Sequence, residues 1–250
     1  MSRTIRTAGV CCAIGSAVAG SGLAAPVKIQ PDESVSQDTF VYEYFQSSSA
    51  ADIYESISPG NGEVLSSVIL ATTRSATGHT MHTLLRFDLT GVSLGPGEKA
   101  VLGLYVRPSA FGSAAPSPSY PASLSVYAGS TPWTESVTWQ TQPLPTGDKV
   151  GSVQVTGTNQ FIEFDVTTQV QAWLSGTANN GFIVQQDTVV VDPNGRGPGV
   201  PGEVGVFFRG AGWSDPSQRP YLQVIPEPTS LAAGLAGLVV RIIRRKRMIS

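Results

Sequence analysis

Hydrophobic and polar residues alternate with a period of two through most of the middle of the chain. Between residues 83 and 89, the side chains of Leu85, Phe87 and Leu89 would share one face of an extended strand. Clusters of Gly, Pro and Asn separate such segments, as turns do. The pattern therefore predicts an all-β fold of many short strands. The expected strands lie at or around residues 39–45, 64–71, 83–89, 100–106, 124–126, 162–166, 182–184, 204–208 and 222–224.

One segment has the spacing of a helix instead. Val170, Trp173 and Leu174 are three and four residues apart, which places them on one helical face. Thr167 or Thr168 can cap the start of this helix, and Gly176 can close its end. A single short helix is expected here, packed against one end of the β structure.

The N-terminus has the three parts of a secretory signal peptide, expected over residues 1–25. Arg3 and Arg6 form a basic start, residues 8–23 are apolar or small, and a small-x-small cleavage site ends at Ala24. A buried N-terminal helix is the alternative, which the glycines and the basic start disfavour. Both cysteines lie in this segment, so the mature chain would contain none. A short polar linker is expected over residues 26–37.

The C-terminus, residues 226–250, has an equally ordered pattern. The tripeptide Pro226, Glu227 and Pro228 precedes a mainly apolar stretch over residues 229–243. A basic cluster follows it, made of Arg244, Arg245, Lys246 and Arg247. The apolar stretch is shorter than the ~20 residues that span a bilayer comfortably. We expect a weakly anchored transmembrane helix, with the basic cluster held on the cytoplasmic side and the rest of the protein outside.

This order of tripeptide, apolar helix and basic end closely resembles the PEP-CTERM sorting signal. The resemblance covers about the last 25 residues. It implies an exosortase as processing partner, transient anchoring in the inner membrane, cleavage near the tripeptide, and export to the cell surface or the extracellular matrix.

Removal of both ends changes the charge of the chain. Nine basic and 17 acidic residues remain between residues 26 and 225, a net charge of about −8. Nucleic-acid binding depends on Lys and Arg contacts to phosphate, so this balance argues against a nucleic-acid partner. It also predicts that a bound glycan would be neutral, unless a local basic patch overrides the net charge.

Several segments of the middle region resemble the DNRLRE domain in their order along the chain. They are residues 38–41, 84–89, 133–139, 164–167, 170–173, 180–182 and 220–222. The resemblance runs from about Gln37 to Ile225, nearly the whole of the expected mature chain. It implies an antiparallel, jelly-roll-like β-sandwich of an extracellular bacterial protein, and some members of this family act as carbohydrate-binding modules.

Four tryptophans are candidates for stacking against sugar rings: Trp133, Trp139, Trp173 and Trp213. Trp139 and Trp173 lie in patterned elements, so core packing is the favoured interpretation for both. Trp213 lies in a turn-rich loop and is the favoured candidate for a glycan contact. Arg196 and Arg209 flank the loops near Trp213 and are the expected seed of any basic patch.

No pattern of catalytic residues is visible, and no cofactor is expected. His79 and His82 lack a third metal ligand nearby. A structural Ca²⁺ ion would require the fold to gather Asp38, Asp165 and Asp187. Residues 192–195, which also contain oxygen ligands, are expected to form a β-turn.

These observations favour a secreted, non-catalytic protein with a structural or adhesive role at the cell surface. Two alternatives remain. One is a carbohydrate-binding module for a neutral polysaccharide, and the other is a polysaccharide-active enzyme that works through carboxylates alone.

Overall fold

The computed structural model describes residues 26–31, 37–57, 69–108, 113–195 and 202–226, which belong to one compact unit, Ala25–Glu227. The expected signal peptide, Arg196 and the C-terminal tail after Pro226 lie outside the described residues. Within the described part, no helix is both long and apolar enough to cross a membrane.

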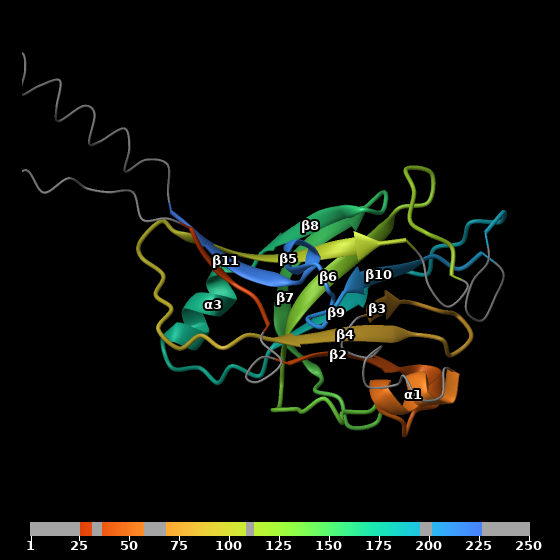
Figure 1. Ribbon diagram of the computed structural model, residues 1–250, viewed down its shortest axis with the longest axis horizontal. Coiled ribbons are helices and arrows are strands. Elements are labelled where there is room, and N and C mark those ends of the chain that lie inside the picture. Colours follow the sequence, from red (N-terminus) through yellow and green to blue (C-terminus); the bar gives the residue numbers. More distant parts are fainter. Residues whose placement is uncertain (1–25, 32–36, 58–68, 109–112, 196–201, 227–250) are drawn as a thin grey trace, which may run out of the picture. The chain divides into compact units, whose positions relative to one another are not determined.

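The described part is an antiparallel sheet of eleven strands that curls around a core (Figure 1). The strands are β1 (Val27–Ile29), β2 (Gln37–Tyr42), β3 (Ile69–Thr73), β4 (Met81–Arg86), β5 (Lys99–Arg107), β6 (Ala122–Gly129), β7 (Pro145–Val155), β8 (Gln160–Asp165), β9 (Phe182–Gln186), β10 (Gly205–Arg209) and β11 (Tyr221–Ile225). Their order across the sheet is β1-β11-β5-β10-β3-β4-β9-β6-β7. Strand β2 pairs with β4, and β8 pairs with β5.

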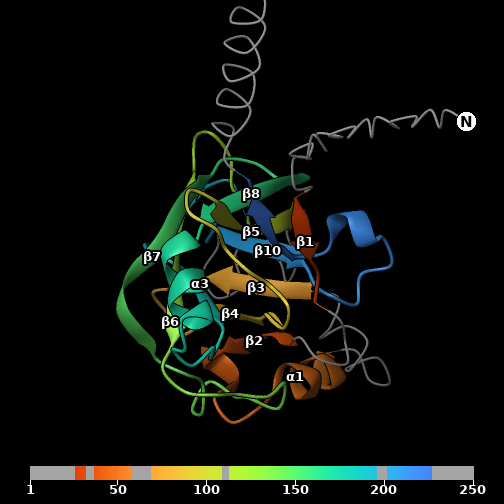
Figure 2. The ribbon, with the colours of Figure 1, turned by 90° about the vertical axis from the view of Figure 1, so that its left-hand side faces the viewer.

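The main core forms because alternate residues of most strands point to the inside of the curl, which is visible end-on in Figure 2. Leu102 and Leu104 of β5 are fully buried there, and so are the inward residues of β6, β9 and β10. Leu85 of β4 and Phe87, the residue just after this strand, are 0% and 2% exposed, which confirms that they share the buried face. Phe164 of β8 is 1% exposed. The all-β fold is therefore confirmed in its coarse form.

Strand boundaries differ from the expected ones at several places. Strand β2 ends at Tyr42, and a 3₁₀ turn, Glu43–Phe45, follows it. Strand β4 ends at Arg86, because its hydrogen-bonded neighbours end there. Its pairing with β2 reaches Arg86, and its pairing with β9 reaches Leu85. Residues 27–29, expected in a linker, form β1, which pairs with β11. The compact unit therefore begins earlier than the expected boundary at residue 38.

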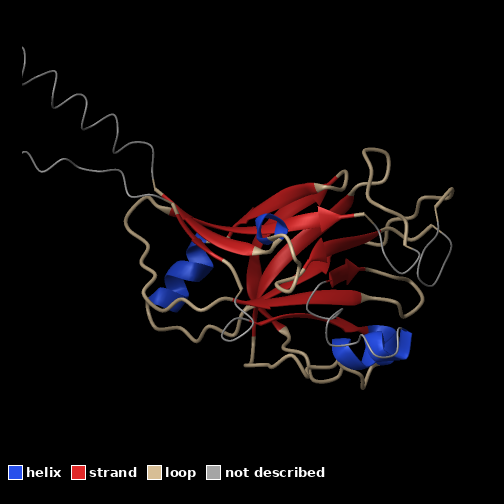
Figure 3. Ribbon diagram, viewed as in Figure 1, coloured by secondary structure: helices blue, strands red, loops and turns tan. Residues whose placement is uncertain are grey.

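Two α-helices lie in the described part, where a single one was expected. Figure 3 colours them blue, together with the short 3₁₀ turns. Helix α3, Thr167–Leu174, is the expected one, and it buries Val170 and Trp173. Gly176 closes it with a φ of 106°, as expected.

The other helix, α1, spans Ala50–Ile57. It begins at a reciprocal cap, in which the hydroxyl of Ser49 donates to Asp52 and accepts from the Asp52 backbone N–H. Its residues Ala50 and Ile53 pack on β2 in a second apolar cluster.

Candidate functional site

Aromatic side chains gather on the outer face of β5, β8 and β11. Tyr105, Phe161 and Tyr221 alternate along their strands with core residues, so they point away from the core. The ring centroids of Tyr105 and Phe161 are 5.2 Å apart, as are those of Phe161 and Tyr221. Tyr105 and Phe161 are half-buried, so part of each ring is open to solvent. Together they form a partly exposed aromatic row.

Gly103 makes room for the third ring of this row. It is the partner of Tyr221 across β5 and β11, and the Tyr221 ring covers it. The Tyr221 hydroxyl donates a hydrogen bond to the carboxylate of Glu163. Burial, and then this bond to an anion, raise the pKa of Tyr221 well above its usual range. Tyr221 therefore stays a neutral donor with a fixed orientation.

Basic side chains lie against the same face. The Lys28 ammonium is 4.3 Å from the centroid of the Tyr221 ring. The guanidinium carbon of Arg209 is 3.4 Å from the centroid of the Trp213 ring, and Arg219 Nε donates to the Trp213 carbonyl at 2.6 Å. Both ring contacts have the geometry of cation–π pairs.

Arg107 and Arg209 bring two like charges together. Phe207 of β10 pairs with Arg107 of β5, and two residues further on Arg209 points to the same side. Burial, and then the charge of Arg107, lower the pKa of Arg209. The Nε of Arg209 and the Nε1 of Trp213 are both buried and have no hydrogen-bond partner among the described residues. Neither nitrogen is open to solvent, so an acceptor from outside would reach it only after these side chains move.

We call this surface the aromatic–cationic face. It comprises Lys28, Tyr105, Arg107, Phe161, Arg209, Trp213, Arg219 and Tyr221.

The structure thus brings together two of the three residues expected at a glycan contact, Trp213 and Arg209, while Arg196 lies outside the described residues. The loop of Trp213 is held by a bond from its N–H to the Gly210 carbonyl and by one from the Ala211 N–H to the Asp38 carboxylate. Trp213 is half-buried, and Arg209 covers one side of its ring. The remaining residues of the face were not predicted; they come from β1, β5, β8 and β11, except for Arg219, which lies just before β11.

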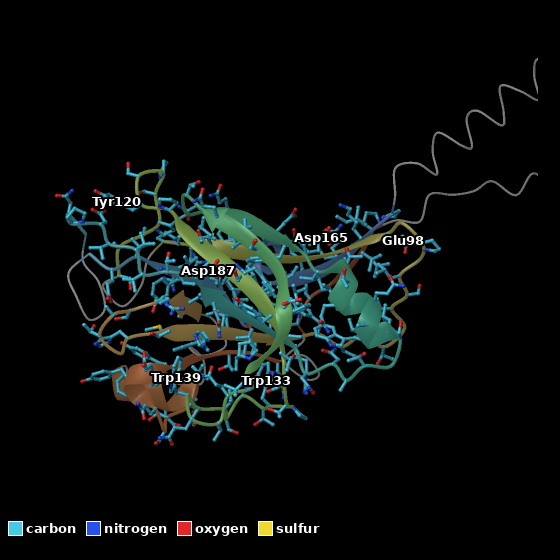
Figure 4. All side chains as sticks on the ribbon, turned by 180° about the vertical axis from the view of Figure 1, so that it is seen from behind. Glu98, Tyr120, Trp133, Trp139, Asp165 and Asp187 are labelled. Carbon is cyan, nitrogen blue, oxygen red and sulfur yellow. The ribbon has the colours of Figure 1, made fainter. Side chains whose placement is uncertain are left out.

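The other tryptophans have different surroundings. Trp173 and Trp133 are 8% and 5% exposed, and the core interpretation of Trp173 is confirmed. Trp139 packs on an apolar cluster that contains Trp133, yet it remains half-buried and lies against His82. Figure 4 shows Trp133 and Trp139 at the part of the sheet near α1. Trp139 is therefore a partly accessible ring as well as a packing residue.

A polar cleft of about 630 Å³ lies beside α3 and contains the carboxylates of Glu98 and Asp165 (Figure 4). Glu98 accepts a bond from the Gly95 N–H at 2.7 Å. Asp165 accepts one from the Thr167 hydroxyl at 2.6 Å, which is the main reason why its pKa is lowered. A general acid needs a raised pKa, so Asp165 is poorly suited to that role.

The three carboxylates that a structural Ca²⁺ ion would require each bind another group. Asp38 binds the Ala211 N–H, Asp165 binds Thr167, and Asp187 pairs with Lys149 at 3.1 Å. Among the described residues, no group of three or more His, Cys, Asp or Glu is placed to hold a metal ion. At residues 192–195, the bond from the Gly195 N–H to the Asp192 carbonyl confirms the expected turn.

Residues 61–190, slightly more than half of the chain, match the family model of carbohydrate-binding module family 96. The match includes Tyr105, Arg107 and Phe161 of the aromatic–cationic face, as well as Trp133 and Trp139. No curated protein matches the chain.

Proposed function

Because the chain belongs to carbohydrate-binding module family 96, we propose that it binds a polysaccharide through the aromatic–cationic face and performs no chemistry on it. The family match supports this binding role better than the structural or adhesive role that the sequence favours. No catalytic arrangement is needed for such a role.

The arrangement of Arg209 against Trp213 carries this proposal. Glycan sites commonly combine an aromatic ring, which contacts the C–H groups of a sugar, with a few well-placed polar groups. Here the half-buried side chains of Arg209 and Trp213 lie against each other on the same face as the partly exposed ring of Tyr105. The half-buried side chain of Arg209 would donate hydrogen bonds to a sugar oxygen at the surface.

The charge of the face favours an acidic polysaccharide. Nine basic residues lie between residues 26 and 225, and four of them are on the aromatic–cationic face: Lys28, Arg107, Arg209 and Arg219. Glu163, which binds Tyr221, contributes one negative charge at its edge. Net charge predicts a neutral ligand, but charges further away than about 10 Å are largely screened at ordinary ionic strength. A guanidinium also matches a carboxylate or sulfate in geometry.

A glycan array with the purified protein tests this function. We expect acidic oligosaccharides among the bound glycans, and a Trp213→Ala variant should lose them while its unfolding free energy changes little. An array on which the wild-type protein binds no glycan would contradict the proposal.

We further propose that the protein is exported and processed as its two ends imply. The signal-peptide pattern and the PEP-CTERM resemblance support an exosortase as partner, a transient membrane anchor and a location at the cell surface or outside the cell. The DNRLRE resemblance supports a jelly-roll variant of the curled antiparallel sheet. A carbohydrate-binding module in this location would attach the protein to extracellular polysaccharide.

A further inference from the structure

We propose a second carbohydrate site, for an uncharged sugar, around Trp139 on the outer face of β4 and β9. This inference rests on the proposed function, to which it adds a separate site and a different ligand class. We call the surface the Trp139 site; it comprises His82, Trp139, Gln142 and Gln185.

The Trp139 site lies on the other side of the core from the aromatic–cationic face. Gln185 alternates with Val184, which points into the main core, and Tyr105 alternates with Leu104, which points into the same core from β5. One ligand of a few sugar units would therefore not contact both surfaces.

The ring of Trp139 belongs to a loop that is held at several points. Trp133 Nε1 donates to the Asn180 carbonyl at 2.9 Å, and Val137 is buried against β4 and β9. The Gln140 N–H donates to the Gln46 carbonyl at 3.1 Å. A platform that is already in place costs less entropy on binding.

The hydrogen bonds around Trp139 determine which sugar groups the site can bind. Gln142 Nε2 donates to the Trp139 carbonyl at 2.9 Å, so its Oε1 accepts from His82 Nδ1, also at 2.9 Å. A neutral His82 then has its acceptor at Nε2, which has no hydrogen-bond partner among the described residues. The His82 and Trp139 rings lie 4.8 Å apart, so this acceptor is beside the platform.

Sugar hydroxyls suit these groups, because a hydroxyl both donates and accepts. Nε2 of His82 would accept from one hydroxyl. The half-buried amide of Gln185 lies with its Nε2 3.4 Å from His82 Nδ1, and its Oε1 would accept from a second hydroxyl. Burial lowers the pKa of His82, so the imidazole is uncharged at neutral pH. The four side chains of the Trp139 site then carry no charge, which distinguishes it from the aromatic–cationic face and favours a neutral sugar.

Two surfaces of this kind would let one molecule join two polysaccharide chains, one acidic and one neutral. A capture experiment tests this: the full-length protein is loaded onto an immobilised uronic-acid polymer and then exposed to soluble neutral mannan or xylan. We expect the loaded surface to capture one of the neutral polymers, and Trp139→Ala to abolish the capture without reducing the loading. Failure of a well-loaded wild-type surface to capture either polymer would overturn the two-sided arrangement.

Direct titration with cellohexaose, xylohexaose and mannohexaose, followed by tryptophan fluorescence, tests the site itself. Trp139→Ala and Gln185→Ala should each weaken binding of the hexaose that the wild type binds, the first by at least about tenfold. Trp139→Phe should retain most of the affinity, and Trp213→Ala, on the other face, should leave it unchanged. Gln185→Ala keeps the test valid if loss of Trp139 disturbs the loop.

The two proposals fail in different ways. If no neutral hexaose binds, or if binding survives both Trp139→Ala and Gln185→Ala, the Trp139 site is excluded while acidic binding is untouched. If neutral binding depends on Trp139 but no acidic glycan binds, the aromatic–cationic face is excluded and the Trp139 site stands.

Discussion

The ring of Tyr221 occupies the space that a side chain on Gly103 would need: a Cβ placed on Gly103 would lie 2.2 Å from Tyr221 Cζ. The two residues are partners across β5 and β11. This close approach lets Tyr221 contact Phe161, Lys28 and Glu163 at the same time. The aromatic–cationic face therefore depends on a residue that has no side chain.

Gly103→Ala should destabilise the protein by about 1–3 kcal/mol, because the new methyl group must displace the Tyr221 ring. Urea denaturation measures this change. Gly157→Ala is a suitable control, since its Cβ would meet nothing closer than Gln160 Nε2 at 3.4 Å. Equal unfolding free energies for the two variants would mean that the Tyr221 ring is not held over Gly103.

The core position of Phe164 makes a second prediction. Phe164→Ala should cost about 3–5 kcal/mol, because it leaves a cavity in the main core. Phe161→Ala, three residues earlier on the outer face, should cost clearly less, because that ring is only half-buried. If Phe164→Ala lowers the unfolding free energy by less than about 1 kcal/mol, the register assigned to β8 is wrong, since a slip of one residue exchanges the two faces.

The burial of His82 predicts how the free energy of unfolding depends on pH. Burial lowers its pKa below the usual 6.5, so the unfolded chain takes up a proton before the folded protein does. This group therefore removes stability as pH falls below about 6.5, and the loss levels off once pH is below the folded-state pKa. Four aspartates also have lowered pKa values, but they reduce stability only in the more acidic range, around pH 3.8 and below. They are Asp52, Asp88, Asp165 and Asp215.

Chemical denaturation at pH 7 and pH 5 should show a smaller loss of stability in His82→Gln than in the wild type. Identical losses in both proteins would show that His82 is not the group responsible.

Much of the core is predictable from sequence because burial on one side of a strand imposes a period of two. Leu85 and Phe87 were assigned to one face in this way, and both are buried in the main core. Strand β7 has no such pattern, because Pro145–Val155 is exposed along most of its length and carries few apolar residues. Helix α1 was missed for a different reason. Its short apolar pattern is weak, although the Ser49–Asp52 cap is a local signal that could have identified it.

The aromatic–cationic face could be predicted only in part. Trp213 and Arg209 are close in sequence, and a turn-rich loop beside a basic residue identified both. Lys28, Tyr105 and Tyr221 meet only because β1, β11 and β5 are neighbours in the sheet. Net charge gave the opposite expectation for the ligand because it averages over all surfaces, whereas strand pairing concentrates basic residues on one of them.

Export predicts a shortened extracellular protein. Its N-terminus should lie near Ala25 or Pro26, and the basic cluster from Arg244 to Arg247 should be absent. Intact mass spectrometry of protein released from the cell surface measures both ends. Recovery outside the cell of a chain that still ends at Ser250 would contradict the proposed processing.

Calorimetric titration of the protein with a hexamer of galacturonic acid tests the central claim most directly, that acidic glycans bind at the aromatic–cationic face. The wild type should bind, with an affinity that falls as salt is added. Arg209→Ala should weaken binding by at least about tenfold, the range of a central aromatic or Arg contact. Arg74→Ala, an exposed arginine outside this face, should leave binding unchanged. Absence of binding by the wild type, or equal affinities for the wild type and Arg209→Ala, would contradict the account.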